Sequence, residues 1–207
     1  MTIKGFLYDK FMSLFERKLG RALRSQLCDG ISGRVLDIGS GTGANLPYIK
    51  KSADQKGDFV EVVSVDPSSS FNSVSEKRAA DLGLHHTIVE TMFEEYSSSQ
   101  PFDYIISSLT MCSCADLERY TLNALSLLKP GGEFRFLEHT YSYRPLLRYL
   151  QTVIDKITHF LTQKPGHLTR PIVETIESSF PLCTILEERN TVFPICRFVL
   201  GVGKSSF

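Results

Sequence analysis

Three alternating glycines, Gly39, Gly41 and Gly43, stand directly after a short apolar run and give the first chemical signal in the chain. Glycine lets the backbone turn sharply and lets a ligand approach without meeting a Cβ atom. The free N–H groups at the start of the helix that follows can bind an anionic group. The segment therefore predicts a ligand-binding loop between a strand and a helix.

Two classes of cofactor use such a loop. The dinucleotide fingerprint G-x-G-x-x-G/A is satisfied by Gly39, Gly41 and Ala44, but this match alone is weak evidence. Asp37, two residues before the first glycine, favours another ligand, because a carboxylate there repels a pyrophosphate and attracts the ammonium group of an amino acid. Asp66, at the end of the next predicted strand, is placed to bind ribose hydroxyls in either case.

The elements that must position these residues alternate between strands and helices. Apolar runs predict strands at 35–38, 59–65, 86–89, 102–107, 133–137, 182–187 and 191–202. Periodic apolar positions predict helices at 5–27, from about 44, 73–82, 117–128, 144–161 and 171–179, with a stop and turn at 129–132. This alternation predicts an α/β fold with a parallel sheet, helices on both faces and ligands at the carboxyl ends of the strands.

The composition limits the domain organisation and the partners. A chain of 207 residues fits a single domain. We divide it into an N-terminal cap helix (1–30), a cofactor-binding core (31–139), a helical cap (140–180) and C-terminal strands (181–207). Lys plus Arg is 23 and Asp plus Glu is 23, so the net charge is zero, which argues against a nucleic-acid partner.

The cysteines and the termini indicate the compartment. The five cysteines are odd in number, and Cys112-Ser113-Cys114 alone is not a zinc pattern, so we predict no metal site. Reduced thiols suit the cytoplasm. We find no signal-peptide pattern and no apolar run near the roughly 18 residues that span a bilayer. We therefore expect a cytoplasmic protein.

Four motifs together resemble the class I S-adenosylmethionine-dependent methyltransferases, in the subset with a methyltransferase type 11 domain. The residues that carry the resemblance, within roughly 33–139, are Leu36 to Gly43, Val65-Asp66-Pro67, Phe102 to Ile106 and Leu127 to Gly132. The resemblance implies a Rossmann-like fold. Its seven-stranded, mostly parallel sheet has the order 3-2-1-4-5-7-6, with the last strand antiparallel.

A narrower resemblance covers most of the chain. The segments Tyr8 to Met12, Gly41 to Tyr48, Leu109 to Ser113, Phe136 to His139 and Gly166 to Arg170 resemble bacterial homologues of the methyltransferase-like 7 family. The animal members are thiol S-methyltransferases with a membrane-anchoring N-terminal segment. We expect no such anchor in this chain.

The resemblance also implies how S-adenosylmethionine is bound. Asp37 and the loop backbone would hold the methionine part, and Asp66 the ribose hydroxyls. Met92 stands where many relatives carry an acidic residue, so Met92 and Phe93 would sandwich the adenine, unless Phe93 is simply core. The full set of expected cofactor residues is Tyr8, Asp37, Gly39, Ser40, Gly41, Gly43, Asn45, Asp66, Pro67, Met92, Phe93, Ser108 and Leu109.

The chemistry of methyl transfer asks mainly for alignment of the acceptor and exclusion of water. A base helps only when the acceptor is protonated, and a thiol with a pKa of about 8.5 is partly ionised already. His139, after the fifth strand, is the candidate base, with a loop histidine bonded to backbone as the alternative. Met111, Cys112 and His167 are the candidate acceptor-site residues, with Cys112 as a small apolar wall.

Both caps are amphipathic. Up to Leu27 the N-terminal helix carries six bases against two acids, and it either packs as a lid or lies on an anionic membrane. The bases are Lys4, Lys10, Arg17, Lys18, Arg21 and Arg24, of which all but Lys4 are expected on the side opposite the apolar face. The helix at 144–161 has one apolar side, expected to form the other cap wall. The apolar residues of both caps predict an apolar acceptor pocket.

Three hypotheses remain open at this stage. The first is methyl transfer to a small apolar or soft acceptor such as a thiol. The second is a lipid N-methyltransferase or quinone C-methyltransferase at the membrane surface, and the third is a non-catalytic binding protein with a methyltransferase fold. Ser107 to Thr110 replaces the N-P-P-Y-like tetrapeptide of some nucleic-acid and protein methyltransferases. The oligomeric state is not predicted.

Overall fold

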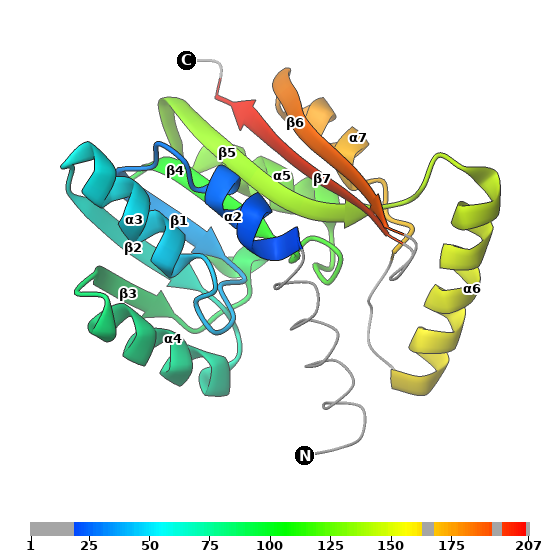
Figure 1. Cartoon of the computed structure of the whole chain (residues 1–207), viewed down its shortest axis with the longest axis horizontal. Coiled ribbons are helices and arrows are strands. Elements are labelled where there is room, and N and C mark those ends of the chain that lie inside the picture. The colour runs from blue at the N-terminus through cyan, green and yellow to red at the C-terminus, as the bar shows by residue number, and fades with distance from the viewer. Residues whose placement is uncertain (1–18, 163–167, 192–195, 206–207) are drawn as a thin grey trace.

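The computed structural model describes residues 19–162, 168–191 and 196–205. Its strands form one seven-stranded sheet in the order β3-β2-β1-β4-β5-β7-β6, in which β7 is antiparallel to both of its neighbours (Figure 1). The strands are β1 (Gly33–Ile38), β2 (Val60–Val65), β3 (His85–Val89), β4 (Phe102–Ser108), β5 (Leu128–Thr140), β6 (Leu182–Thr191) and β7 (Cys196–Lys204). The predicted fold class, strand order and antiparallel last strand are confirmed.

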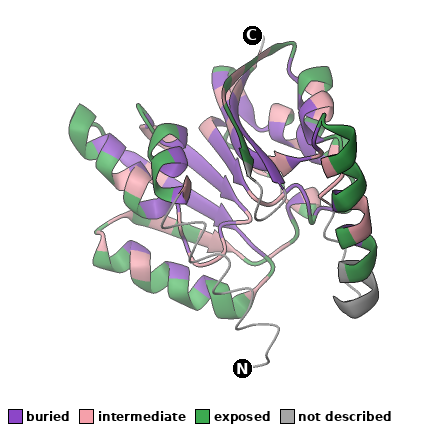
Figure 2. Cartoon of the chain, turned by 45° about the vertical axis from the view of Figure 1, so that its right-hand side comes forward, coloured by how far each residue is buried: buried purple, intermediate pink, exposed green. Residues whose placement is uncertain are grey.

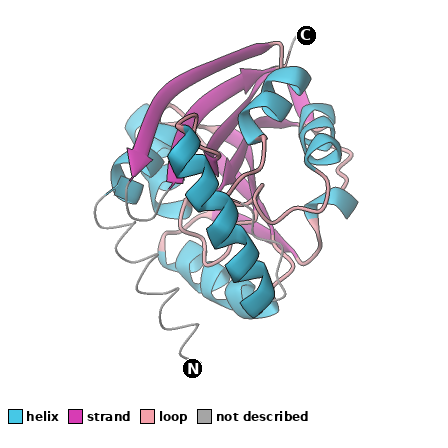
Figure 3. Ribbon diagram, turned by 90° about the vertical axis from the view of Figure 1, so that its right-hand side faces the viewer, coloured by secondary structure: helices cyan, strands magenta, loops and turns pink. Residues whose placement is uncertain are grey.

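Helices cover both faces of the sheet (Figure 3). One face carries α2 (Arg21–Leu27), α3 (Leu46–Lys56) and α4 (Ser69–Asp81), and the other carries η2 (Phe93–Glu95), α5 (Leu117–Ser126) and α7 (Ile172–Ser179). Each face has its own apolar core. Val35 packs in the first core and Leu36 in the second, because successive side chains of a strand point to opposite faces.

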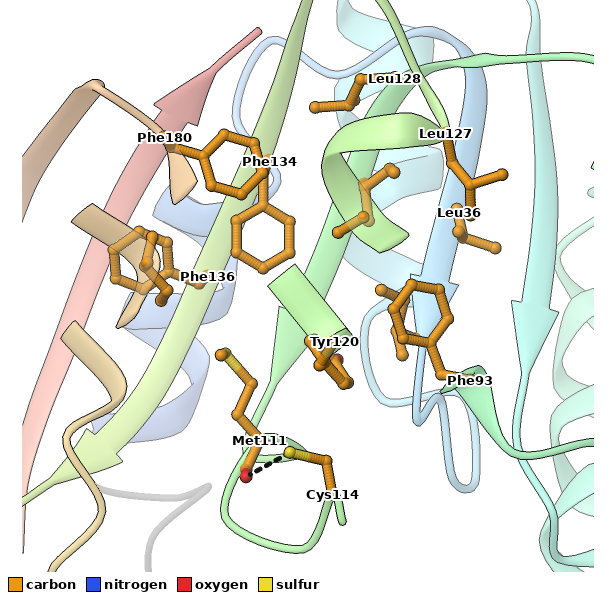
Figure 4. Close-up of a cluster of buried hydrophobic side chains, with 14 of the residues drawn as sticks. Leu36, Phe93, Met111, Cys114, Tyr120, Leu127, Leu128, Phe134, Phe136 and Phe180 are labelled. Carbon is orange, nitrogen blue, oxygen red and sulfur yellow. Dashed lines mark hydrogen bonds between the residues drawn. The ribbon is translucent and has the colours of Figure 1, made fainter. Parts of the chain in front are cut away.

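Aromatic rings fill the second core (Figure 4). Phe134 stacks on Phe180 with the ring centres 5.0 Å apart, and Phe93 meets Tyr120 edge-on at 4.7 Å. All four side chains are buried. This rigid core holds β4 and β5, whose carboxyl ends form part of the candidate site.

The Lys-Pro-Gly-Gly motif (129–132) lies at the amino end of β5, whereas the glycine loop follows the carboxyl end of β1. The prediction placed a helix up to 128 and a turn at 129–132, whereas α5 ends at Ser126 and these residues form an irregular start of β5. Lys129 Nζ donates to both carboxylate oxygens of Asp103 at 2.8 Å. The motif therefore has a structural role, because the ion pair between Lys129 and Asp103 joins the start of β5 to β4.

Other boundaries differ modestly from the prediction. Helix α4 begins at Ser69, four residues before the predicted start, since its first turn has a single apolar residue, the exposed Phe71, and gives no periodic signal. Strand β7 starts at Cys196, later than the predicted 191. Of the predicted helix at 5–27, the structure describes only α2 and the two residues before it.

Helix α6 (Pro145–Thr162) stands apart from both cores and contradicts its prediction (Figures 1 and 2). The apolar side was expected to pack as a cap wall, yet Leu146, Leu150 and Ile157 are exposed. Within residues 145–157 of α6, whose side chains are described, the buried ones are instead Gln151 and Asp155. Among the described helices, none combines the length and the apolar character needed to cross a bilayer.

Candidate functional site

The glycine loop lies at the carboxyl end of β1. Gly39, Gly41 and Gly43 have φ angles of 60°, 53° and 72°, which other residue types rarely adopt. A Cβ atom on Gly39 would lie 2.3 Å from Thr110 Oγ1, and one on Gly43 would lie 2.7 Å from Ser75 Oγ. At Gly41 the same atom would meet nothing within 4 Å. The first and third glycines are thus required by packing, and the second leaves open space for a ligand.

Asp37 is fully buried beneath this loop. Its Oδ1 accepts a hydrogen bond from Asn45 Nδ2 at 2.8 Å, while its Oδ2 is buried with no partner among the described residues. Burial raises the pKa of Asp37 to about 6, against the lowering effects of Asn45 and Arg24. A buried oxygen without a donor costs about 1–3 kcal/mol, so this atom fits a ligand ammonium group.

Arg24 is a site residue that the sequence analysis missed. It was expected on the outer, basic face of the N-terminal helix, but α2 buries it. Its Nη1 donates to Asn45 Oδ1 at 2.5 Å and to Ser108 Oγ at 2.9 Å. Because Arg24 occupies the amide oxygen of Asn45, the amide nitrogen is directed at Asp37. The available signal was that Arg24 lies three residues before the apolar Leu27, on nearly the same side of the helix.

Asp66 joins the ends of β1 and β2. Its Oδ2 accepts from the backbone N–H of Gly41 and its Oδ1 from that of Ser68, each at 2.9 Å. A carboxylate has about four acceptor sites, so each oxygen can still accept a ribose hydroxyl as predicted. Pro67 beside it is exposed.

The adenine prediction needs a correction at Phe93. The ring of Phe93 is buried against Tyr120 in the core (Figure 4), so it cannot stack on a base. Met92, by contrast, is 41% exposed. The expected sandwich is therefore reduced to the side chain of Met92 and the backbone of Phe93.

The segment after β4 is held by a second missed residue, Glu138. Its Oε1 accepts from Ser107 Oγ at 2.8 Å and from the backbone N–H groups of Thr110 and Met111 at 3.0 and 3.2 Å. Burial raises its pKa to about 7. Leu109, inside this segment, has a φ of 57° and is the one non-glycine residue in the described part of the chain with a positive φ. Such strain tends to occur at functional sites when the surroundings enforce it.

Two predicted acceptor residues have different surroundings. Met111 has no exposed surface and lies in the core (Figure 4). Arg170 Nη1 donates to its carbonyl oxygen at 2.9 Å. It supports the site and does not line it, so that prediction was wrong. Cys112 is 8% exposed, and burial raises the pKa of its thiol to about 12. A protonated, buried thiol is consistent with the predicted apolar wall.

His139 lies within β5, directly opposite Phe198 of β7, and not in a loop. Its Nδ1 is buried without a hydrogen-bond partner among the described residues. Burial lowers its pKa to about 4, although Asp155 opposes the shift. The ring is therefore neutral near pH 7 and can accept a proton. An apolar cluster of Leu19, Leu109, Leu168, Cys196 and Phe198 lies close by.

Two predicted residues, Tyr8 and His167, lie outside the described residues, and their roles stay predictions.

Unsatisfied polar atoms concentrate where the strands end. The described residues contain eight buried side-chain atoms without a partner. Four of them belong to Asp37, Ser40, Glu138 and His139, at the carboxyl ends of β1 and β5. A surface hollow of about 500 Å³ beside α5 and η2 is lined by none of the eight. The unsatisfied atoms therefore mark the candidate site better than the hollow does.

Comparison with known proteins places the chain in context. A family model described as a methyltransferase domain matches residues 8–179. The human thiol S-methyltransferase TMT1A is 29% identical over 164 residues, which cover 75% of this chain and 63% of that protein. The chain therefore matches less than two thirds of the human protein's length. The ubiquinone/menaquinone biosynthesis C-methyltransferase UbiE of Bartonella quintana is 29% identical over 188 residues, which cover 84% of this chain and 70% of that protein.

Solved structures share the fold. The YcgJ protein of Bacillus subtilis has a TM-score of 0.70 at 14% identity, covering 93% of this chain and 99% of that one. The N-methyltransferase NodS of Bradyrhizobium japonicum, in complex with S-adenosyl-L-homocysteine, has a TM-score of 0.65 at 16% identity, covering 93% and 88%. At these identities the likeness concerns the fold alone.

Proposed function

The chain belongs to the methyltransferase domain family, and on this premise we propose that it transfers a methyl group to the sulfur of a small, apolar thiol. It is a class I enzyme that uses S-adenosylmethionine as the methyl donor. The identity of the acceptor is the part that we propose. The observation that carries it is the combination of an apolar acceptor side with a neutral histidine at the end of β5.

The residues of the loop fit the donor. Bound S-adenosylmethionine supplies a methyl group on a positively charged sulfur, which makes the carbon electrophilic. Asp37 Oδ2, buried and without a partner, would hold the ammonium group, and Asp66 would accept from the ribose hydroxyls. Arg24 and Asn45 keep the Asp37 carboxylate in place by a chain of hydrogen bonds.

The acceptor side favours a thiol for a chemical reason. The cluster beside His139 contains Leu109, Cys196 and Phe198, and the electrostatics place Cys112 near Cys196. Burial keeps both thiols protonated and His139 neutral at neutral pH, and the buried Asp155 is the charge that acts on His139 and Cys196. A thiol needs little help to ionise, so even a weak base such as neutral His139, with a pKa of about 4, can accept its proton transiently through Nδ1 and pass it on to solvent. A sulfur lone pair then forms the new bond to the methyl carbon as the donor carbon–sulfur bond breaks. The apolar wall excludes water, which would otherwise solvate the thiolate.

The two curated relatives suggest two acceptors. The human relative is named a thiol S-methyltransferase, which supports the thiol. The Bartonella relative is named a C-methyltransferase of quinone biosynthesis, and a larger share of its length is matched. A quinol ring carbon is therefore the second candidate. It needs a stronger base than a histidine with a pKa of about 4.

A methyl-transfer screen tests the proposal. The purified protein is incubated with labelled S-adenosylmethionine and matched sets of aryl and alkyl thiols, phenols, quinols and amines, and each methylated product is identified by mass spectrometry. We expect transfer to apolar thiols and much slower transfer to the corresponding phenols. An enzyme that methylates quinols or amines but no thiol would refute the thiol assignment. The Asp37→Asn variant serves as the inactive control.

A further inference from the structure

Helix α6 has its polar side buried and its apolar side exposed. Gln151 Oε1 accepts from the backbone N–H of Ser142 at 2.7 Å, and its Nε2 donates to Thr140 O at 3.2 Å. Asp155 accepts from the backbone N–H and the hydroxyl of Thr169, at 3.2 and 2.8 Å, and from the backbone N–H of Leu168 at 2.8 Å. These bonds attach α6 to the ends of β5 and to the segment before α7.

The opposite side of α6 is apolar and faces solvent (Figure 2). Leu146 is 71% exposed, Tyr149 66%, Ile157 54%, and Leu150 and Ile154 36% each. Spacings of three, four and seven residues place them on one side of the helix. A contiguous strip of exposed apolar side chains on a protein surface indicates an interaction site.

The exposed charges on and directly before the described part of α6 have one sign, and Lys156 is the one that lies next to the apolar strip. Arg144, Arg148 and Lys156 are exposed, whereas Asp155, the acid of α6, is buried and engaged in the bonds described above. An amphipathic helix with cations beside an apolar side is the pattern of helices that lie in the headgroup region of a membrane. The exposed Tyr143 and Tyr149 add aromatic rings of the kind that gather at membrane interfaces.

We propose that α6 is a docking surface for an anionic lipid bilayer, with Leu146, Leu150 and Ile157 inserted among the headgroups. Gln151 bonds to Thr140, the residue after His139, so bilayer contact would bring the acceptor side of the site to the lipid surface. Apolar acceptors dissolved in the membrane could then reach the site without crossing water. The proposal is independent of which atom of the acceptor is methylated.

Charge argues against two other occupants. A second copy of the chain docked through α6 would bring the same cations and no exposed acid from the described part of that helix. The segment 1–18 carries Lys4, Lys10, Arg17 and Lys18 against Asp9 and Glu16, so it is basic too. An anionic bilayer complements the charge of α6, whereas neither of these partners offers it a net negative charge.

Vesicle co-sedimentation of the full chain tests the proposal. The vesicles consist of phosphatidylcholine alone or with about a third of phosphatidylglycerol, a level at which surface potential attracts basic helices. We expect binding to the anionic vesicles that salt weakens. The double variant Leu146→Glu/Ile157→Glu should reduce that binding by about tenfold or more, because it removes inserted apolar surface and adds charge. Affinity for S-adenosylhomocysteine, measured by calorimetry, should stay unchanged and so verifies folding.

Matched controls separate a specific surface from general stickiness. Leu122→Glu/Val74→Glu replaces residues of similar exposure, 50% and 45%, on α5 and α4 and should leave vesicle binding intact. Arg144→Gln/Lys156→Gln should abolish the preference for anionic vesicles, while Lys51→Gln/Lys77→Gln should not.

Three results would overturn the proposal. They are the absence of vesicle binding by the wild type, equal losses in the α6 variant and its control, and a dimer in sedimentation that the α6 variant dissociates. Unchanged vesicle binding with failure of every thiol in the methyl-transfer screen would refute the proposed acceptor alone.

Discussion

The two halves of the candidate site differ in polarity. The cofactor half, at the ends of β1 and β2, is a buried polar network. Arg24 donates a hydrogen bond to Asn45, and Asn45 donates one to Asp37. The acceptor half, at the ends of β4, β5 and β7, is apolar and contains a neutral histidine. Both halves keep buried polar atoms without partners among the described residues.

This difference follows from what each half must recognise. S-adenosylmethionine carries an ammonium group and ribose hydroxyls, so a fixed set of charges and backbone groups serves it. An apolar acceptor offers few groups to hydrogen-bond, so the acceptor half works by shape, by exclusion of water and by one proton acceptor. Changes in the cofactor half should therefore alter binding, and changes in the acceptor half should alter turnover.

The largest effect is expected at Asp37. Asp37→Asn removes the charge that faces the ligand ammonium, and we expect the Kd for S-adenosylhomocysteine to rise about 100-fold, since a charge-assisted hydrogen bond contributes about 1.5–3 kcal/mol. The free energy of unfolding should stay level or rise, because burial already disfavours the ionised carboxylate. Calorimetry and denaturant titration measure the two quantities. Asp81→Asn, an exposed change of the same kind, is the control, and equal losses in both variants would contradict the assignment.

Arg24 comes next. Arg24→Met removes the donor to Asn45 and Ser108, and we expect affinity for S-adenosylhomocysteine to fall about tenfold. In the wild type, affinity should decline as the pH drops through the pKa of Asp37, about 6, because the protonated carboxyl no longer attracts the ammonium group. Arg24 lowers that pKa, so the variant's decline should begin at a higher pH.

The pH profile of binding separates positioning from mere stability. Arg21→Met, an exposed change on the same helix, should leave both affinity and profile unaltered. An Arg24→Met protein with reduced affinity but an unmoved profile would show that Arg24 does not act through Asp37.

His139 should affect turnover and not binding. His139→Gln is expected to lower kcat with an apolar thiol about fivefold, a small loss for a proton acceptor because the thiol ionises partly unaided. The wild-type rate should show no inflection near pH 6.5, since burial lowers the histidine pKa to about 4. A rise in the Kd for S-adenosylhomocysteine that matches the loss of kcat would place His139 in the cofactor half.

Glu138 should give a pH-dependent change in stability. Its pKa is about 7 in the folded protein and near 4.5 when unfolded, so between these values the folded state binds the extra proton. Its contribution to the free energy of unfolding is therefore lost as the pH rises through this window. The free energy of unfolding of Glu138→Gln minus that of the wild type should be higher at pH 7 than at pH 4.5 by at least about 1 kcal/mol. Denaturant titrations at the two ends measure it, and a constant difference would contradict the buried-carboxyl interpretation.

The smallest effect is expected at Cys112. Cys112→Ala should change kcat by less than about twofold, because a buried thiol acts only as a small apolar wall. Burial raises the pKa of the thiol to about 12, so the wild-type residue should also resist alkylation near neutral pH. Rapid maleimide labelling that S-adenosylhomocysteine prevents would instead make Cys112 a reactive site residue.

Local patterns in the sequence determined the fold class and the cofactor. The glycine spacing, Asp37 before it and Asp66 after the next strand lie within about thirty residues, and each follows from the end of its own strand. Parallel strands bring their carboxyl ends to one edge, so local predictions assembled correctly into a site. The strand order came from the family resemblance and was confirmed.

Tertiary structure alone decided which residues support the site and which side of a helix is buried. Arg24 reaches Ser108 across 84 positions of sequence, and Glu138 reaches Thr110 across 28. Periodicity identified the apolar side of α6, but it could not show that Gln151 and Asp155 bond to β5 and residues 168–169 and turn that side outward. Hydrophobic periodicity shows which residues of a helix are apolar. Which side of the helix is then buried depends on its contacts with distant parts of the chain.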